Sequence, residues 1–536
     1  MKYADLHCHN HMRAYFWSQG REPHFRRNNL DNAWTVISSN LRSQSKAGMA
    51  AAYSQCDLVK AWNGGVRLTF NSLYPIEKGF FVSPESPSDG KSMFLREVIR
   101  KVTHHRLPLR TILQMVYMRI PDRLVKKFQD LDYDYWEAIQ EEVEFLDKTN
   151  GVEVSNQIYT PGFLRRAVES RSNRRRLRPL SLNATGIYRI PKNLRELETS
   201  LEKEEITMVM TIEGAHALGT DQASLPIEKF LKRVDFIKKD WPFPIFFITF
   251  AHHFNNFLCG HAHSIPDIGK WLLNQDNGKN DGFNENGWKV IRRFLSLNQD
   301  NQRDDSLGYR ILIDVKHMSA LARKEFYEEI VLKCYKNGDV IPVIASHCGF
   351  SGKFSLDDHI QNFDLENDSY FDVSGNFNAW NINMCQEDVR IIFKTRGLFG
   401  LSFDQRIMGI PKKEDPNASR NNIRCLWDNI KYIVKTIYED TSVPASEKSE
   451  IWDCIMIGTD FEGLIDPVTP YPTVLEFCEF EIDLVDTINE NRSHVPGENQ
   501  FLAFLESPED TLKLVRKLCY DNAEKFVKKH YFKTFR

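Results

Sequence analysis

Short apolar runs of the kind that form buried β-strands recur along the chain, separated by longer segments with helical spacing of apolar residues. Apolar side chains spaced three and four apart predict amphipathic helices, for example over 423–437 and 514–526. Eight runs are predicted strands: residues 2–7, 66–72, 206–213, 245–250, 311–314, 341–346, 398–403 and 455–459. Eight strands alternating with helices predict an α/β fold, a (β/α)8 barrel of the TIM type, whose functional residues lie at the carboxyl ends of the strands.

The connection between the second and third predicted strands is too long for a simple crossover. Inside it, apolar residues such as Trp136 and Val143 have helical spacing. An arginine-rich run over 165–178 is read first as a solvated charged surface and alternatively as a binding site for an anion. We therefore expect one domain over residues 1–536, a hydrolase-type barrel with an inserted, mainly helical segment at about 75–205.

Composition and charge exclude several classes of protein. The 536 residues are 42% hydrophobic and 27% charged, as in ordinary globular proteins, which argues against long disorder. The 70 Lys+Arg nearly balance the 73 Asp+Glu, so the net charge predicts no attraction to nucleic acid or to a membrane surface. The N-terminus lacks a secretion signal, no apolar run could span a bilayer, and the cysteines form no CxxC pairs. We expect a cytoplasmic protein with a small-molecule substrate, and the oligomeric state, a homo-oligomer included, stays open.

Residue types that ligate metals stand at the predicted strand ends. On the first strand, a period of two places His7 and His9 on one face, where two imidazoles can hold one ion. Alone, an HxH pair is a weak signal because such pairs arise by chance. Further residues of ligand type follow at other strand ends, namely Glu213, His317, His347 and Asp460. Each could be an ordinary polar cap, but together the six suit one or two borderline divalent ions such as Zn²⁺.

The motifs around these residues resemble those of the membrane dipeptidase (renal dipeptidase, peptidase M19) family of the amidohydrolase superfamily. The resemblance runs in order from Asp5 to about Tyr531 and leaves only the insertions uncovered. The order and strand placement of the motifs are more specific than any one of them. The segments that carry the resemblance are DLHCHN, GGVRLTFNSLYP, EGAHAL, FITFAHHFNN, GFNENGWKVI, IDVKHMS, VIASH, GTDFEG and DNAEKFVKKHY.

The resemblance implies a metal-dependent hydrolase that cleaves the C–N bond of a small peptide or amide. It implies two divalent metal ions, with zinc first among the candidates. Its ligand pattern carries over to this chain as His7 and His9 on the first metal, Glu213 between the two, and His317 and His347 on the second. A carboxylate that bridges two cations holds them close together, and a water that they share then ionises to hydroxide near pH 7.

The resemblance also implies the catalytic and substrate-binding residues. Asp460 would take the proton of the attacking water and return it to the leaving nitrogen. His252 would contact the substrate carbonyl and donate to the developing oxyanion. His216 would either contact the substrate or orient Glu213, and Asn255 is a further candidate for substrate binding.

The chain departs from the family pattern at two places. The family usually has HxD on the first strand, whereas this chain has His9, which removes one negative charge and should leave the metals more Lewis acidic. The arginine that binds the dipeptide's terminal carboxylate in the family aligns with Ile382 or Asn383. Unless an arginine from 165–178 reaches the barrel mouth, we expect free dipeptides to bind poorly compared with neutral amides, because a buried carboxylate needs a cationic partner.

Two other functions stay open beside the leading one. HxH in a context such as DLHCH also opens other amidohydrolases and phosphoesterases of the polymerase-and-histidinol-phosphatase (PHP) type, but the further His/Asp motifs of a trinuclear site do not follow here in order. The third hypothesis is an inactive barrel that serves as a binding scaffold through its insertions. The presence of all six ligand-type residues argues against that scaffold.

Overall fold

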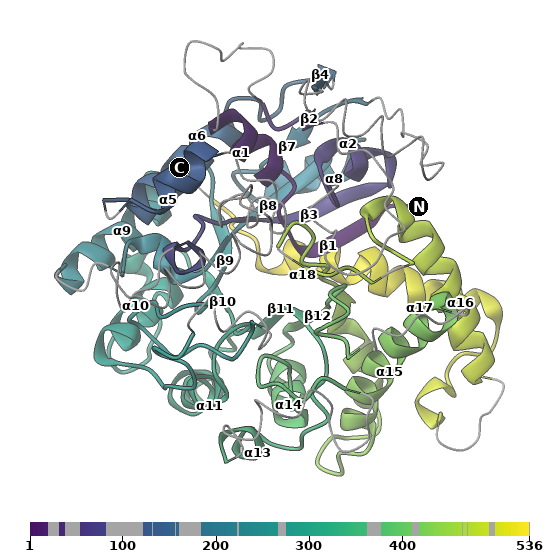
Figure 1. Ribbon diagram of the computed structural model, residues 1–536. Coiled ribbons are helices and arrows are strands. Elements are labelled where there is room, and N and C mark those ends of the chain that lie inside the picture. Colours follow the sequence, from purple (N-terminus) through teal and green to yellow (C-terminus); the bar gives the residue numbers. More distant parts are fainter. Residues whose placement is uncertain are drawn as a thin grey trace, which may run out of the picture.

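The computed structural model contains a parallel eight-stranded barrel surrounded by helices (Figure 1). It describes residues 1–19, 32–37, 54–81, 122–130, 132–155, 157–159, 184–221, 225–265, 275–361, 377–409, 418–463, 465–468, 470–492 and 499–534. The barrel strands follow one another in chain order: β1 (Tyr3–Cys8), β3 (Val66–Leu73), β8 (Ile206–Glu213), β9 (Ile245–Thr249), β10 (Leu312–Asp314), β11 (Ile344–Cys348), β12 (Leu398–Leu401) and β13 (Ile455–Ile457). The predicted (β/α)8 barrel is therefore confirmed, and each of the eight predicted runs contains or overlaps one of its strands.

The first and last strands meet just beyond their carboxyl ends. Cys8 and Phe461 form a parallel bridge, and the backbone N–H of Asp460 donates to the carbonyl of His7 at 2.9 Å. The Asp5 carboxylate, inside β1, accepts from the backbone N–H of Thr459 at 2.9 Å. These contacts bring the two chain regions that carry His7 and Asp460 side by side.

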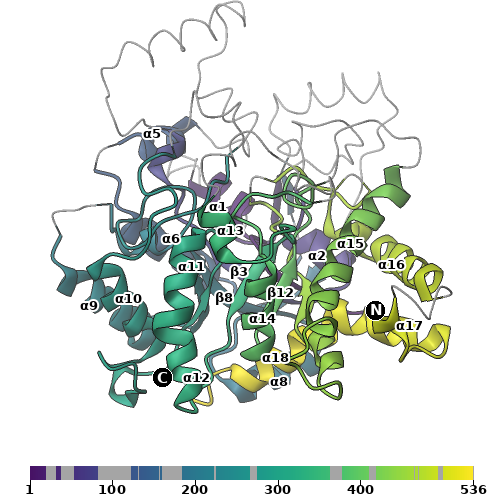
Figure 2. The same cartoon turned by 90° about the horizontal axis from the view of Figure 1, so that it is seen from below.

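A separate apolar cluster fills the interior of the barrel. It is built from alternating strand residues that point inward, because successive side chains of a strand face opposite sides. Leu6 of β1, Phe70 of β3 and Met456 of β13 belong to it. Helix α18 (Asn522–His530) covers the amino-terminal end of the barrel (Figure 2), where the ring of Phe526 lies 6.0 Å from that of Phe246. With that end closed, the carboxyl ends of the strands are the open end of the barrel.

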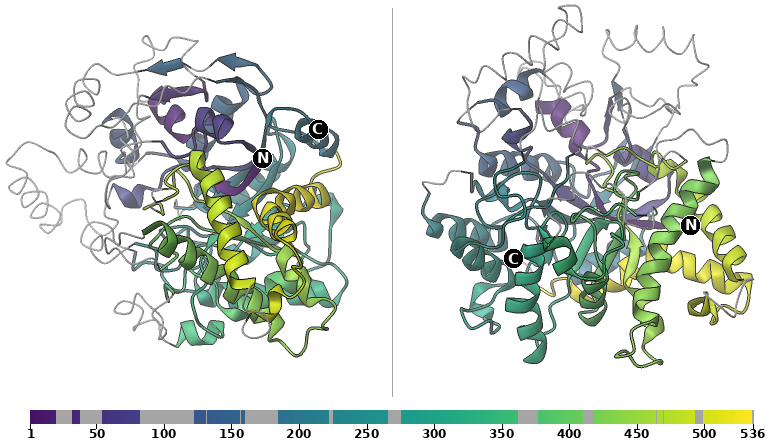
Figure 3. Two further views of the ribbon diagram at one scale, coloured as in Figure 1. Left: turned by 90° about the vertical axis from the view of Figure 1, so that its right-hand side faces the viewer. Right: turned by 60° about the horizontal axis from the view of Figure 1, so that its bottom comes forward.

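Helices follow most strands and pack around the barrel. Green-to-yellow helices α15, α16 and α17 pack in sequence along one flank (Figure 3). Among the described residues, no helix has the length and apolar character needed to cross a membrane. The remaining helices are α1 (Met12–Gln19), α2 (Leu58–Asn63), α5 (Asp122–Phe128), α6 (Tyr135–Asp147), α8 (Leu194–Glu202), α9 (Ile227–Lys239), α10 (Glu285–Leu295), α11 (Ala320–Phe326), α12 (Leu332–Lys336), α13 (Leu356–Ile360) and α14 (Gln386–Lys394), and the three flank helices are α15 (Ala418–Tyr438), α16 (Phe477–Arg492) and α17 (Pro508–Arg516).

Local sequence explains where these helices start. The Asn284 side chain accepts from the backbone N–H of Gly287 and caps α10, so this helix begins within the GFNENGWKVI motif. Helix α17 begins with a capping box between Ser507 and Asp510, with Pro508 at the first helical position.

The stretch from 75 to 205 contains short elements in its described parts. Its helices are α5, α6 and α8. Three two-residue strands, β4 (Val154–Ser155), β6 (Thr185–Gly186) and β7 (Tyr188–Arg189), lie between α6 and α8 in the chain. The three-residue strand β5 (Gln157–Tyr159) pairs with β2 (Thr35–Ile37). The interpretation of this stretch as a helical insertion in a single domain stays a prediction, and the arginine-rich run over 165–178 lies outside the described residues.

Helix α6 is fastened to the barrel by one buried carboxylate. Glu142 Oε1 lies 2.5 Å from Nε2 of His11, just after β1, and both carboxylate oxygens accept from the backbone N–H of Tyr74, just after β3. These three contacts hold α6 beside the open end of the barrel.

Candidate metal centre

The carboxylate of Glu213 lies at the centre of a group of imidazoles at the open end of the barrel. Glu213 is the last residue of β8 and is 2% exposed. Its Oε2 lies 3.1 Å from Nε2 of His9, and its Oε1 lies 3.2 Å from Nε2 of His7. Nε2 atoms of three more histidines lie 3.3 to 3.8 Å from Oε1, those of His252, His317 and His347. The structure therefore brings the five proposed metal ligands and His252 to one place.

Asp460 lies at the edge of this group. Its Oδ1 is 3.8 Å from Nε2 of His7 and its Oδ2 is 3.9 Å from Nε2 of His347. The side chain of Asp460 is 14% exposed, against 3% for Glu213. Asp460 is thus the more accessible of the two carboxylates.

Two of the site residues occupy left-handed backbone conformations. His317 has φ 66° and Asp460 has φ 63°. Such conformations cost about 1–3 kcal/mol for residues with a side chain and cluster at functional sites. Each residue follows the end of its strand, and the turn aims the side chain back over the barrel mouth, toward Glu213 and His347.

Hydrogen bonds behind the imidazoles fix their orientation. Nδ1 of His9 lies 2.8 Å from the carbonyl of Ser72, which leaves Nε2 directed at Glu213. Nδ1 of His347 lies 2.8 Å from Oγ of Ser346, and this hydroxyl donates to Oδ2 of Asp314 at 2.6 Å. Asp314 therefore orients the imidazole of His347 through the hydroxyl of Ser346. Outer contacts of this kind are typical of metal-ligating histidines.

The donor atoms fit divalent cations. The Nε2 atoms of His7 and His9 are buried and form no hydrogen bond of good geometry among the described residues. Nε2 of His317 lies 3.2 Å from Nε2 of His347, close enough for both nitrogens to bind one cation. His7, Glu213, His347 and Asp460 each offer a ligand atom within 4.8 Å of the others. Imidazole and carboxylate donors of this kind are those that zinc prefers.

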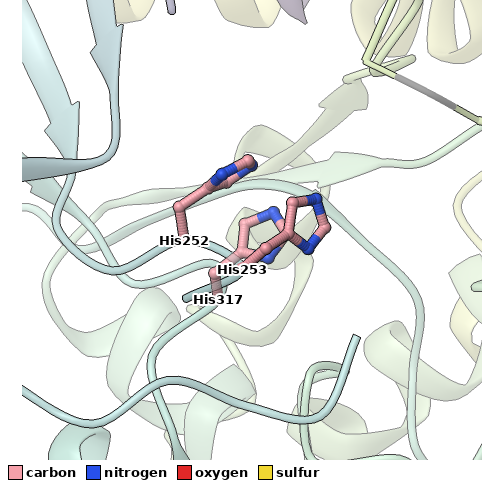
Figure 4. Close-up of side chains that lie close together, drawn as sticks. All are labelled: His252, His253 and His317. Carbon is pink, nitrogen blue, oxygen red and sulfur yellow. The ribbon is translucent and has the colours of Figure 1, made fainter. Parts of the chain in front are cut away.

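His253 extends the group of imidazoles beyond the predicted ligands. His252, His253 and His317 also offer donor atoms within 4.8 Å of one another (Figure 4). The ring centroids of His252 and His253 lie 4.6 and 5.0 Å from that of His317. Nδ1 of His253 lies 2.7 Å from Oγ of Ser264, so a loop hydroxyl orients this ring. His253 was not among the predicted site residues, and its place beside His252 in an HH pair was the signal that could have found it.

His252 lies between two carboxylates. Its Nδ1 is 2.5 Å from Oε2 of Glu77, and its Nε2 is 3.3 Å from Oε1 of Glu213. Burial alone would lower the pKa of His252, but the charges of Glu77 and Glu213 outweigh burial and raise it to about 10. Burial likewise opposes ionisation of Glu77, and the charge of His252 overcomes it and lowers the pKa of Glu77 to about 2. The two carboxylates therefore favour the protonated form of His252, whose Nε2 faces Glu213.

Glu77 is a site residue that sequence reasoning missed. It follows β3 in the segment LYPIE and also accepts from the backbone N–H of Phe254 at 3.1 Å. In the sequence, Glu77 looks like an ordinary carboxylate in a loop, and its contact with His252 follows only from the folded structure. The unusual feature that could have signalled it is a carboxylate so soon after a barrel strand.

The two carboxylates at the centre have opposite proton affinities. Burial alone would raise the pKa of Glu213, but the positive charge of His252 and the nearby His7 hold it well below its ordinary value. Burial raises the pKa of Asp460 well above its ordinary value, and the negative charge of Glu213 raises it further. Glu213 therefore stays a carboxylate, whereas Asp460 is able to accept and hold a proton.

Two predicted substrate-binding residues, His216 and Asn255, belong to the loops around the site. Nε2 of His216 is 2.8 Å from the carbonyl of Pro75, and its Nδ1 is 4.0 Å from Glu77. The Asn255 side chain donates to Asn277 at 2.9 Å and accepts from a neighbouring backbone N–H. His216 therefore contacts the loop that carries Glu77, and its ring stacks on that of His252 with the centroids 6.2 Å apart. The contacts of Asn255 are within the loops after β9.

The segment aligned with the family's arginine holds no polar group for a substrate. Ile382 belongs to a small apolar cluster with Ala262, Trp380 and Ile407. Asn383 Nδ2 donates to the carbonyls of Asn378 and Ile407, and its Oδ1 accepts from the backbone N–H of Gly349. This segment therefore serves the packing of the loop.

The sequence matches no protein-family model and no curated protein. The structure is similar to solved structures of metallopeptidases and amidohydrolases. One is dipeptidase AC, a metallopeptidase of family M19, which is 12% identical, with 100% of this chain and 99% of that chain covered and a TM-score of 0.46. Another is a metallopeptidase from Rhodobacter sphaeroides with a phosphinate mimic of the dipeptide L-Ala-D-Ala, which is 13% identical, with 99% of each chain covered and a TM-score of 0.45. An amidohydrolase from Pseudomonas aeruginosa is 10% identical, with 93% of this chain and 94% of that chain covered and a TM-score of 0.40.

Proposed function

We propose that this protein is a metal-dependent hydrolase of the M19 dipeptidase type that cleaves the C–N bond of a small peptide or amide. One observation carries the proposal: the Glu213 carboxylate has Nε2 atoms of five histidines within 3.8 Å, with Asp460 beside them at the open end of the barrel. A barrel that needed only stability would have no reason to gather these groups at that end.

The proposed ligands would hold two divalent ions, with zinc as the first candidate. His7 and His9 would hold one ion and His317 and His347 the other. Glu213 would contact both, because its carboxylate lies within 3.8 Å of Nε2 of all four histidines. Bound there, two such ions would supply the Lewis acidity that makes a water molecule nucleophilic near neutral pH.

The chain's own residues supply the proton transfers and the charge stabilisation. Asp460 would take a proton from the attacking water and deliver it to the leaving nitrogen, consistent with its raised pKa and partial exposure. His252, kept protonated by Glu77, would donate from Nε2 to the oxygen that becomes negative during attack on the carbonyl.

We further propose that the chain is a single hydrolase domain and that the segment at about 75–205 forms its cap. The contacts of Glu142 with His11 and Tyr74 support this proposal, since they hold α6 beside the site. His216 and Asn255 would then act from the surrounding loops on the substrate or on the residues that contact it.

Metal analysis and two substrate panels test the proposal. We expect purified protein to bind about two equivalents of zinc and to hydrolyse members of a panel of dipeptides and their C-terminal amides. A panel of phosphomonoesters and phosphodiesters, run in parallel, tests the alternative PHP-type activity. The proposal is wrong if the zinc-loaded protein cleaves only phosphoesters, and absence of zinc binding together with absence of turnover indicates a scaffold.

A further inference from the structure

The carboxylate of Glu77 meets His252 from the start of a short turn of 3-10 helix. Glu77 is 2% exposed and directly precedes this turn, η4 (Lys78–Phe80). Its Oε2 lies 2.5 Å from Nδ1 of His252, and its Oε1 accepts from the backbone N–H of Phe254 at 3.1 Å. Both oxygens of Glu77 are therefore engaged by the loop that carries His252.

A carboxylate in this position ordinarily has another use. The first N–H groups of a helical turn have no partner inside the turn, and a polar side chain at the preceding residue commonly accepts from them. Glu77 occupies that preceding position, but its side chain accepts no hydrogen bond from η4. Another group must therefore provide the acceptor at the start of this turn.

The hydroxyl of Tyr135 provides that acceptor. The backbone N–H of Lys78 donates to the hydroxyl oxygen of Tyr135 at 2.7 Å. Tyr135 is the first residue of α6 and is 4% exposed. Its ring also packs edge-on against the ring of His216 with the centroids 4.9 Å apart, and the ring of His216 in turn stacks on that of His252. Tyr135 therefore contacts both segments that surround the pair of Glu77 and His252.

Helix α6 is anchored on both sides of this tyrosine. Asp134, which caps the helix, lies 3.5 Å from Nη2 of Arg233 in α9. Two turns further along the helix, the carboxylate of Glu142 accepts from the backbone N–H of Tyr74. The hydroxyl of Tyr135 is therefore a fixed acceptor for the turn that begins after Glu77.

We propose that Tyr135 is a positioning residue that keeps the Glu77 carboxylate on His252 by capping η4 in place of Glu77. The inference rests on the proposed hydrolase function and gives α6 of the proposed cap a task in it. Without the Tyr135 hydroxyl, the backbone N–H of Lys78 would lose its acceptor, and a donor without an acceptor is costly. The carboxylate of the preceding residue, Glu77, is placed to replace that acceptor. It would do so at the expense of its hydrogen bond with His252.

The kinetic test compares Tyr135→Phe with Tyr133→Phe in zinc-loaded full-length protein. Tyr133 is a matched control because it is 5% exposed, its ring lies 5.3 Å from that of Tyr135, and its hydroxyl forms no hydrogen bond with the described residues. Tyr135→Phe should lower kcat at least about fivefold and change KM less than about twofold, because His252 acts on the transition state. Its zinc content should equal that of the wild type, and Tyr133→Phe should match the wild type throughout. Equal kcat in the two variants would overturn the inference.

A double-mutant cycle with Glu77→Gln separates positioning from general support of the fold. If Tyr135 acts through Glu77, Tyr135→Phe should lower kcat less than about twofold in the Glu77→Gln background, where the charged acceptor of His252 is already absent. A tyrosine that only packs against its neighbours would cost the same factor in both backgrounds. Equal factors would therefore overturn the inference.

A spectroscopic measurement keeps the inference testable whether or not an amide is cleaved. In zinc-loaded protein with isotope-labelled histidine, the Nδ1–H of His252, hydrogen-bonded to a carboxylate at 2.5 Å, should give a downfield proton resonance that is missing in His252→Asn. We expect this resonance to move or vanish in Tyr135→Phe and to stay in place in Tyr133→Phe. Its absence from the wild type, or an unchanged position in both variants, would overturn the inference. If no amide is cleaved but the resonance still distinguishes the two variants, the proposed function fails and the positioning role stands.

Discussion

The central carboxylate gives the sharpest test of the metal centre. Glu213→Gln keeps the size and shape of the side chain but removes its charge and replaces one oxygen by an NH2 group. In the structure, Oε1 faces Nε2 of His7 and Oε2 faces Nε2 of His9 at 3.2 and 3.1 Å. Whichever oxygen is replaced, the NH2 group then points at imidazole nitrogens and offers no lone pair to a cation. Lone pairs for only one cation remain, on the other oxygen. We therefore expect at least one of the two zinc ions to be lost.

The size of the effect follows from linkage between metal binding and folding. An ion present at 100 times its dissociation constant stabilises the folded state by about 2.7 kcal/mol. Unfolding entropy of about 2.1 cal/mol/K per residue gives about 1.1 kcal/mol/K for 536 residues. Each bound ion should thus raise the melting temperature by about 2–3 °C, and two ions by about 5 °C. In Glu213→Gln the zinc-dependent rise should fall to about half of this or less.

Activity should fall more steeply than stability. Loss of a group that merely orients a metal ligand costs about 10–100-fold, so loss of a shared ligand should exceed about 100-fold in kcat. The assay combines zinc content by mass spectrometry, melting temperature with and without zinc, and turnover. Retention of both ions and of normal turnover in Glu213→Gln would refute the bridging role.

A matched variant controls for the burial of a carboxylate. Glu142 is 1% exposed and its Oε1 lies 2.5 Å from Nε2 of His11, and its other hydrogen bonds are from the backbone N–H of Tyr74, which is not a proposed ligand. Glu142→Gln should lower the melting temperature with and without zinc by similar amounts and leave the zinc content at two. If Glu142→Gln loses zinc as Glu213→Gln does, the loss reflects general damage to the barrel mouth.

Three further changes test other parts of the structure. His9→Ala should lose zinc, whereas His9→Asp should keep zinc and part of the activity, because a carboxylate can replace the imidazole as a ligand; equal zinc content in wild type and His9→Ala contradicts this. Glu77→Gln should lower kcat at least tenfold at unchanged zinc content, since Nδ1 of His252 loses its charged acceptor at 2.5 Å, and an unchanged kcat would remove Glu77 from the mechanism. Burial lowers the pKa of His530 to about 4 from its ordinary value of 6.5, so its contribution to stability is complete above pH 6.5 and is lost as the pH falls toward 4. His530→Leu should therefore show a smaller drop in melting temperature between pH 7 and pH 4.5 than the wild type, and an equal drop would be inconsistent with a buried neutral imidazole.

The barrel was predictable because parallel strands covered on both faces are nearly continuous apolar runs. The β8 segment, ITMVMTIE, is buried at every position and was located to the residue. Strand β11 was predicted at 341–346 and lies at Ile344–Cys348. Residues 341–343 are also buried, but Pro342 has no N–H to donate to a neighbouring strand. The hydrogen bond from the backbone N–H of Leu398 to the carbonyl of Val343 is where contact with β12 begins. Hydrophobicity predicts burial, and the exact hydrogen-bonded register needs the neighbouring strands.

The residues that gather at Glu213 were predictable from their place at strand ends, whereas their neighbours were not. Beyond a strand end, alternation no longer decides which way a side chain points. His252 and His253 are adjacent, yet their rings both lie near His317 because β9 has ended at Thr249. Contact between Glu77 and His252 joins residues far apart in the chain. A carboxylate soon after β3 makes Glu77 a candidate site residue, but only the fold shows that its partner is His252.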